Sequence, residues 1–118
     1  MRSYPATLHR IFDPDMVELA IDVGFGEPRR ARVKLIGFDI EASDEERGRL
    51  LDFILQWIAE VGRADPENPF PLRVTSDGDE WTRPAVYSGE IFGGPGPASL
   101  NLSILEFCRR ERIAGFCP

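Results

Sequence analysis

Two segments of alternating apolar and polar residues, joined by a glycine-rich turn, place the strongest constraint on how this chain folds. The first follows the turn-forming triplet Asp13-Pro14-Asp15 and has apolar side chains at every second position from Val17 to Val23. After Gly24-Phe25-Gly26, the segment from Arg32 to Phe38 returns with the same period. A period of two is typical of a strand that buries one face. The stretch therefore predicts two neighbouring antiparallel strands.

Two carboxylates stand at ends of these strands that antiparallel pairing brings together. Asp15 begins the first strand, and Asp39 directly follows the second. In an antiparallel pair, the start of one strand lies beside the end of the other. Paired carboxylate oxygens bind hard divalent cations such as Ca²⁺. We therefore expect Asp15 and Asp39 to approach each other at one end of the sheet, as a candidate cation site.

The remaining segments predict further strands and two or three helices in one domain of the α+β class. Ser43 and Glu46 fit a capping box, and Gly62 is expected to end the helix that begins there. Ser99 is expected to cap a final helix that runs to about Arg112. The other predicted strands are 4–12, 72–76 and 83–92, and one apolar stripe of the first helix is expected to face the sheet: Leu50, Phe53, Ile54, Trp57, Ile58 and Val61.

Composition and charge limit the classes of function. The chain has 118 residues with a net charge of −6, a poor background for a general nucleic-acid binder. A basic cluster around the second predicted strand is either a local phosphate contact or an ordinary solvated surface, and it consists of Arg29, Arg30, Arg32 and Lys34. No apolar run approaches the roughly 20 residues that cross a bilayer, and no secretory signal is evident. We therefore expect a cytoplasmic protein without membrane contact.

The other candidate side chains favour structural interpretations. His9 is the single histidine, and we expect it on the surface or at the barrel rim. Cys108 and Cys117 lack metal-site spacing, and two reduced thiols are favoured over a terminal disulfide. Arg109, Arg110 and Arg112 lie near the end of the last predicted helix, where cations favour the helix dipole.

Short motifs lie in a set order along the chain, with the link Asp22-Val23-Gly24-Phe25-Gly26 between the two alternating segments. This order resembles that of the staphylococcal nuclease family, and the link resembles the variant found in phage-borne members. Residues 11–17 are similar to the family's I-D-G-D-T-V hairpin, and 33–42 to its V-R-L-x-G-I-D-T-P-E strand. Residues 79–83 are similar to D-K-Y-G-R, and 99–101 match S-L-N. The resemblance covers nearly the whole chain. It implies a single domain over 1–118, a five-stranded barrel of the oligonucleotide/oligosaccharide-binding (OB) type.

The resemblance also implies roles for individual residues. The family's metal ligands map onto Asp15, Asp39 and the backbone carbonyl of Ile40, and its phosphate-binding arginines map onto Lys34 and Arg83. Its catalytic Glu maps onto Ala42, which has no carboxylate. Glu41 is the nearest acid, but a shift of one residue on an extended segment points the side chain the other way.

Two functions follow from this mixture of retained and lost residues. The first is a domain with little or no nuclease activity that binds nucleic acid or protein. The losses at Ala42 and Lys34 favour it, as does Met16, which stands where the family has Thr after the second Asp of the hairpin. The second is a Ca²⁺-dependent phosphodiesterase of DNA or RNA, with Glu41 as base and Lys34 and Arg83 on the phosphate. With two carboxylates and one carbonyl as ligands, calcium binding is expected to be weak. In either case the phage-type motifs imply the cytoplasm of a host cell.

Overall fold

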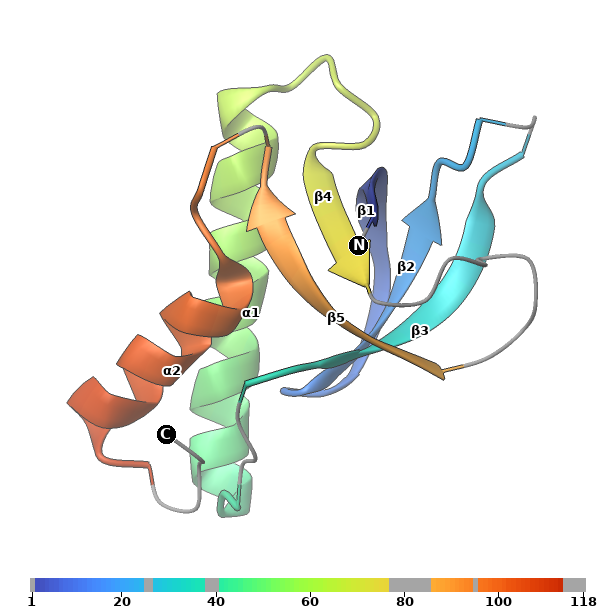
Figure 1. The fold of residues 1–118 in the computed structure, drawn as a ribbon. Coiled ribbons are helices and arrows are strands. Elements are labelled where there is room, and N and C mark those ends of the chain that lie inside the picture. Colours follow the sequence, from blue (N-terminus) through green and yellow to red (C-terminus); the bar gives the residue numbers. More distant parts are fainter. Residues whose placement is uncertain (1, 25–26, 38–40, 77–85, 95, 114–118) are drawn as a thin grey trace.

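The computed structural model describes residues 2–24, 27–37, 41–76, 86–94 and 96–113. Within these residues the chain forms five strands and two helices, in an α+β arrangement (Figure 1). The elements are β1 (Arg2–Asp13), β2 (Met16–Ile21), β3 (Arg29–Leu35), α1 (Asp44–Ala64), β4 (Leu72–Ser76), β5 (Val86–Gly93) and α2 (Leu100–Glu111). The predicted α+β barrel of five strands is confirmed.

The strands form a closed barrel in the order β1-β2-β3-β5-β4. Four of the five pairings are antiparallel, and the barrel closes through β1 with β4. The remaining pair, β3 with β5, is parallel and runs from Arg32 opposite Val86 to Leu35 opposite Gly89. Parallel neighbouring strands need a long connection, and here α1 and β4 lie between β3 and β5 in the sequence. Because the barrel is closed, each of the described strands pairs with two neighbours.

Alternation along the strands fills the barrel with aliphatic side chains. In β2 and β3, every second side chain from Val17 to Ile21 and from Ala31 to Leu35 is buried. The intervening positions, such as Glu18 and Arg32, point outward. The predicted period of two is therefore confirmed. The strand bounds differ by a few residues: β1 is longer than predicted, β2 ends before Val23, and β3 begins three residues earlier and ends at Leu35.

Helix α1 packs its apolar stripe toward the barrel, as predicted. Leu50 and Ile54 are fully buried, and Trp57 packs against the core. A Cβ built on Gly93 of β5 would lie 3.3 Å from the Trp57 ring, so glycine permits this close approach. The predicted end at Gly62 is wrong, because the helix continues to Ala64. Asp65 leaves the helix since the residue before Pro66 disfavours helical backbone.

Helix α2 lies beside α1, and Figure 1 shows both helices on one side of the barrel. Ser99 caps α2 as predicted, with its Oγ accepting a hydrogen bond from the Leu102 N–H at 3.2 Å. The rings of Phe53 and Phe107 stack between the two helices with centroids 4.5 Å apart. Neither helix in the described part of the chain is long and apolar enough to cross a membrane.

Candidate functional site

The hairpin between β1 and β2 places Asp15 beside the end of β3. Asp13 pairs with Met16, which leaves Pro14 and Asp15 as a two-residue turn. The backbone carbonyl of Asp15 accepts a hydrogen bond from the Leu35 N–H at 2.8 Å. The turn is therefore bonded to the last residue of β3, and the sequence-based placement of Asp15 beside that strand end is confirmed.

The Asp15 carboxylate forms an ion pair with Lys34 of β3. Lys34 Nζ donates to Asp15 Oδ2 at 3.1 Å, and the two side chains are 44% and 24% exposed. The register explains the contact, because Lys34 lies opposite Met16, the residue after Asp15. The residues expected as a metal ligand and as a phosphate contact thus neutralise each other. A divalent cation at Asp15 must displace or share this ammonium group.

The other hairpin carboxylate is also engaged. Arg47, in the second turn of α1, donates to Asp13 Oδ1. The sequence analysis did not select Arg47, since its partner lies 34 positions earlier in the chain. The pair fixes the hairpin tip against the start of α1, so the Asp15 end of the barrel is held by contacts from both a strand and a helix.

Residues 41 and 42 lie between this end of the barrel and the start of α1. Glu41 is exposed, whereas Ala42 is partly buried and packs against the core. A carboxylate introduced at position 42 would therefore be partly buried, whereas the Glu41 side chain is exposed to solvent. The candidates Asp39, Ile40 and Arg83 lie outside the described residues, so their proposed roles stay predictions.

Other candidate metal-binding side chains and one of the two thiols lie in the described part of the chain, which does not include the expected ligands Asp39 and Ile40. There, no three His, Cys, Asp or Glu side chains lie together so as to hold a metal ion. Cys108 is free and buried in α2, while Cys117 lies outside the described residues. Burial first, and then the negative charge of Glu46, raise the pKa of the Cys108 thiol. The group is consequently a neutral core side chain and not a reactive thiolate.

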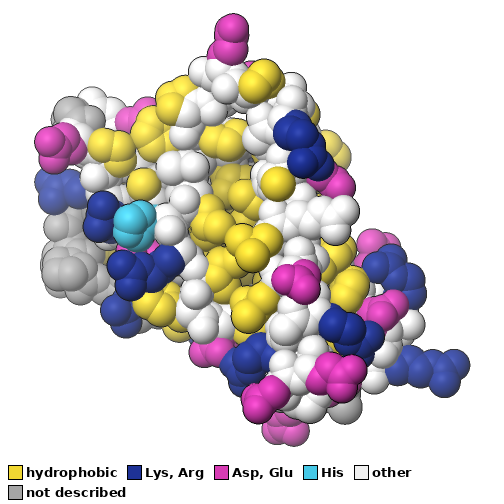
Figure 2. All heavy atoms as spheres, turned by 180° about the vertical axis from the view of Figure 1, so that it is seen from behind, with side chains coloured by type: hydrophobic (Ala, Val, Ile, Leu, Met, Phe, Trp, Pro, Cys, Tyr) yellow, Lys and Arg dark blue, Asp and Glu magenta, His cyan; other side chains and the backbone are white. Residues whose placement is uncertain are grey.

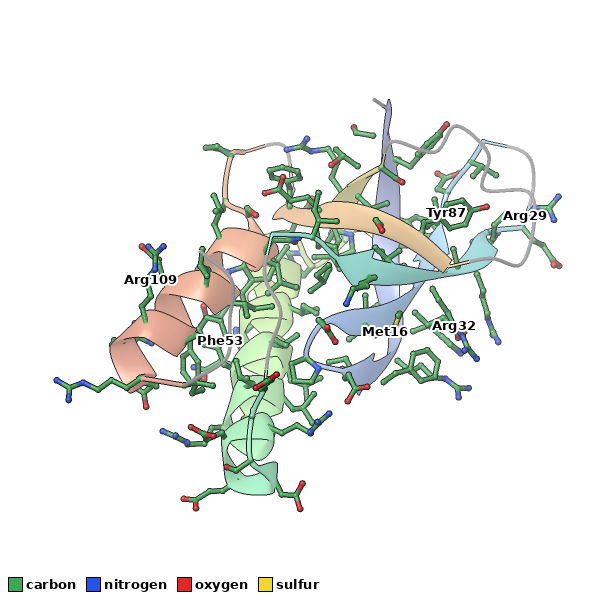
Figure 3. All side chains as sticks on the ribbon, turned by 60° about the horizontal axis from the view of Figure 1, so that its bottom comes forward. Met16, Arg29, Arg32, Phe53, Tyr87 and Arg109 are labelled. Atoms are coloured by element: carbon green, nitrogen blue, oxygen red, sulfur yellow. The ribbon has the colours of Figure 1, made fainter. Side chains whose placement is uncertain are left out.

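A second cluster of charged and aromatic side chains lies on the outer face of β1, β2 and β3. The guanidinium carbons of Arg10 and Arg32 lie 5.7 and 4.6 Å from the centroid of the Phe12 ring, within the range of a cation–π contact. The ring is 37% exposed. In Figure 3, Arg32 projects from the barrel on the same side as Met16. Sequence reasoning missed Arg10 and Phe12, although both occupy outward positions of a strand that it predicted.

A register shift in β1 brings His9 and Arg10 to the same carboxylate. The shift falls between Leu8 and Arg10, and it places His9 and Arg10 opposite Glu18 of β2. His9 Nε2 lies 3.4 Å and Arg10 Nε 3.7 Å from Glu18 Oε1. His9 is exposed, which confirms its predicted surface position. Such a two-against-one arrangement is what a β-bulge produces.

Asn101 of α2 is the buried polar residue that joins the helix to the barrel. Its Oδ1 accepts from the Ile91 N–H at 3.0 Å, and its Nδ2 donates to the carbonyls of Ile36 and Gly89 at 2.9 and 3.1 Å. The sequence analysis noted Asn101 only as part of a motif. Its structural role explains why an amide at this position is useful: one side chain supplies both the acceptor and the two N–H donors that the strand backbone needs.

No protein-family model and no curated protein matches this chain.

Proposed function

We propose that the chain is a divergent staphylococcal nuclease-like domain with little or no nuclease activity, kept as a module that binds nucleic acid. The five-stranded closed barrel supports the OB-type part of this proposal, since OB folds are five-stranded barrels that bind oligonucleotides. The motif order along the chain supports the nuclease-like part. The observation that carries the loss of activity is the ion pair between Asp15 and Lys34.

The ion pair bears on activity through the metal. A calcium ion needs six to eight oxygen ligands at about 2.3–2.6 Å, and each carboxylate contributes most when it is free. The Asp15 carboxylate already accepts from a Lys34 ammonium 3.1 Å away. Asp39 and the Ile40 carbonyl are the other proposed ligands. A calcium ion held by these residues would stabilise the charge of a phosphodiester. It would have to compete with the Lys34 ammonium group for the Asp15 carboxylate, which is one of the two proposed carboxylate ligands.

The position of the general base supports the same conclusion. Attack on a phosphodiester needs an oriented water as well as charge stabilisation. Ala42 has no group to orient that water, and its side chain packs against the core. Losing a positioned base typically costs about 10²–10⁴ in rate. Lys34 keeps a positive charge but lacks the planar two-pronged geometry of arginine on phosphate.

A working metal-dependent phosphodiesterase is the second candidate. Glu41 is exposed one residue from Ala42, and the Asp15 carboxylate is still 24% exposed at the barrel end. In this alternative Glu41 is a relocated base, and Lys34 turns from Asp15 to the phosphate once a cation binds Asp15.

A digestion assay separates the two functions. The wild-type chain, incubated with single- and double-stranded DNA and RNA, is expected to show no calcium-dependent cleavage above a metal-free control. Restoring the family motif by the combined substitutions Lys34→Arg, Ile40→Thr, Glu41→Pro and Ala42→Glu is expected to create or raise cleavage. Robust cleavage by the wild type that is lost in Glu41→Gln would instead establish the phosphodiesterase.

Calorimetry tests the role of the ion pair independently of catalysis. The wild type is expected to bind Ca²⁺ weakly or not at all, and Lys34→Gln is expected to bind it more tightly because the Asp15 carboxylate is freed. Asp15→Asn in the Lys34→Gln background should remove that gain. Arg63→Gln, which removes an exposed cation from the far end of α1, is the matched control. Equal calcium affinity in the wild type and Lys34→Gln would contradict the argument.

A further inference from the structure

We propose that the outer face of β1 and β3 formed by Arg10, Phe12, Arg30 and Arg32, here called the arginine–phenylalanine face, binds single-stranded nucleic acid. The inference rests on the proposed binding role of the domain, but it uses none of the residues assigned to the metal or to catalysis. It names both the surface and the class of partner.

The cations on this face are regularly spaced. Arg30, Arg32 and Lys34 occupy alternate outward positions of β3, and Arg30 and Arg32 are exposed. Side chains two residues apart on a strand are about 6.6–6.8 Å apart. That spacing resembles the separation of successive phosphates along an extended single strand. Lys34 ends the row at its ion pair with Asp15, so Arg30 and Arg32 are the cations proposed to meet phosphate.

The local charge is opposite to that of the whole chain. Opposite Arg32 across the strands stands Glu18, and next to Arg30 stands Ala20. Glu18 lies within 3.7 Å of His9 and Arg10, so one acid stands among three arginines and the face keeps a net positive charge. Figure 2 shows the histidine beside a group of Lys and Arg side chains. Within a chain of net charge −6, this face attracts a polyanion locally while the rest repels it, which orients an approaching strand.

Phe12 distinguishes a nucleic acid from a purely acidic partner. Its ring is 37% exposed, and the guanidinium carbons of Arg10 and Arg32 lie within 5.7 Å of its centroid. Sites for single strands combine basic side chains with aromatic rings on which bases stack, and arginine planes add to the stacking. Arg10, at 5.7 Å the more distant of the two, can turn to a phosphate while a base takes its place on the ring. Bases in a duplex are stacked and paired, so they do not reach such a ring.

Fluorescence anisotropy of a labelled oligothymidylate with the full-length wild-type chain tests the proposal. Binding is expected at low salt, with a log–log salt slope of about −2 for roughly three phosphate contacts. Arg10→Gln combined with Arg32→Gln is expected to weaken binding by at least ~10-fold. The matched control, Arg63→Gln combined with Arg109→Gln, makes the same change in charge on the helices and should leave binding within ~2-fold. Figure 3 shows Arg109 on α2, on the opposite side of the molecule from Arg32.

Substitutions at Phe12 test the stacking step. Phe12→Leu keeps an apolar side chain at a partly exposed position, so the fold should persist by circular dichroism, while binding should fall roughly 5- to 100-fold. Phe12→Trp should retain binding. No binding by the wild type, or equal losses in the face and control variants, would overturn the proposal. So would a polyglutamate peptide that competes as well as the oligonucleotide and is insensitive to Phe12→Leu, since that result assigns the face to acidic peptides.

The outcomes remain separable from those of the digestion assay. Cleavage by the wild type would overturn the proposed loss of activity and leave binding at this face intact. Oligonucleotide binding by the wild type that the Arg10, Arg32 and Phe12 substitutions do not weaken would overturn the present inference alone. Absence of binding to single and to double strands would overturn the proposed nucleic-acid binding role as well.

Discussion

At the scale of single residues, the buried side-chain amide of Asn101 links α2 to the strands of the barrel. Asn101 is 4% exposed and contacts three backbone groups, two of them on β5 and one just past β3. The carbonyl of Gly89 also accepts from the Ile36 N–H at 3.1 Å, so the same amide lies where two strands separate. The side chain thereby holds α2 to the point where the parallel pair ends.

Replacing this amide should be costly. In Asn101→Ala, the Ile91 N–H and the Ile36 carbonyl lose their partner in a buried site, and each orphaned group costs about 1–3 kcal/mol. We expect a loss of about 2–4 kcal/mol in the free energy of unfolding, measured by denaturant titration. Asn68→Ala is the control, because Asn68 also makes two hydrogen bonds but is exposed. A loss in Asn101→Ala no larger than that in Asn68→Ala would show that the network contributes little.

At the scale of elements, the start of α1 is the best defined local signal in the chain. Ser43 Oγ accepts from the Glu46 N–H at 3.2 Å, and Glu46 Oε1 accepts from the Ser43 N–H at 3.0 Å. The backbone hydrogen bond from Ser43, followed by the one from its side chain, lowers the pKa of Glu46 below its ordinary 4.5. Two N–H groups that the helix leaves unpaired are thus satisfied by two neighbouring side chains.

Removing the cap should weaken the fold in a way that depends on pH. Ser43→Ala is expected to lose about 0.5–2 kcal/mol of stability near neutral pH, and Ser43→Asn, which can still accept the hydrogen bond, much less. Since the folded-state pKa of Glu46 is lowered, its contribution is present above 4.5 and is lost as the pH falls through the lowered value. The destabilisation by Glu46→Gln, measured by denaturant titration across this range, should therefore shrink toward acid. A constant difference would contradict the assignment.

Local signals explain which elements were predictable from the sequence. The capping residues Ser43 and Ser99 gave both helix starts, and the period of two gave β2 and β3, because these features depend on residues a few positions apart. The predicted end of α1 at Gly62 was wrong, because the helix continues to Ala64 and ends only before Asp65, the residue that precedes Pro66.

The candidate site was harder to predict than the fold, because its contacts join distant positions. Asp15 was placed correctly beside the end of β3, but the sequence assigned Asp15 and Lys34 separate roles and gave no sign that they pair. The contact between Arg47 and Asp13 spans 34 positions. Phe12 lies near both Arg10 and Arg32 only because the register sets β1, β2 and β3 side by side. The periodicity of the sequence predicts which face of a strand a side chain lies on. Which side chains meet across neighbouring strands depends on the register, which the sequence pattern does not give.

At the scale of the whole molecule, barrel closure brings the two proposed surfaces together on one rigid frame. The parallel β3–β5 pair is one of the five pairings of the barrel, and Gly89 lies at the point where β3, β5 and β4 meet, opposite both Leu35 and Ser76. The arginine–phenylalanine face depends on β3 keeping its register with β2 and β1. A change that opens the barrel at Gly89 should therefore disturb stability and oligonucleotide binding together.

Gly89→Ala tests this dependence. A Cβ at Gly89 would lie 2.5 Å from the Thr75 carbonyl oxygen and 3.3 Å from Val33 Cγ1, so backbone of β4 or β5 has to move. Overpacking of this kind typically costs about 1–3 kcal/mol, and we expect a loss in that range by denaturant titration. Gly48→Ala is the matched control: nothing lies within 4 Å of its Cβ, and alanine in an exposed helix interior should stabilise α1 by roughly 0.5–1 kcal/mol. Opposite signs for the two substitutions, with weaker oligonucleotide binding only in Gly89→Ala, would establish that the β3–β5 pairing supports the binding face. Unchanged stability in Gly89→Ala would show that the strands relax without cost.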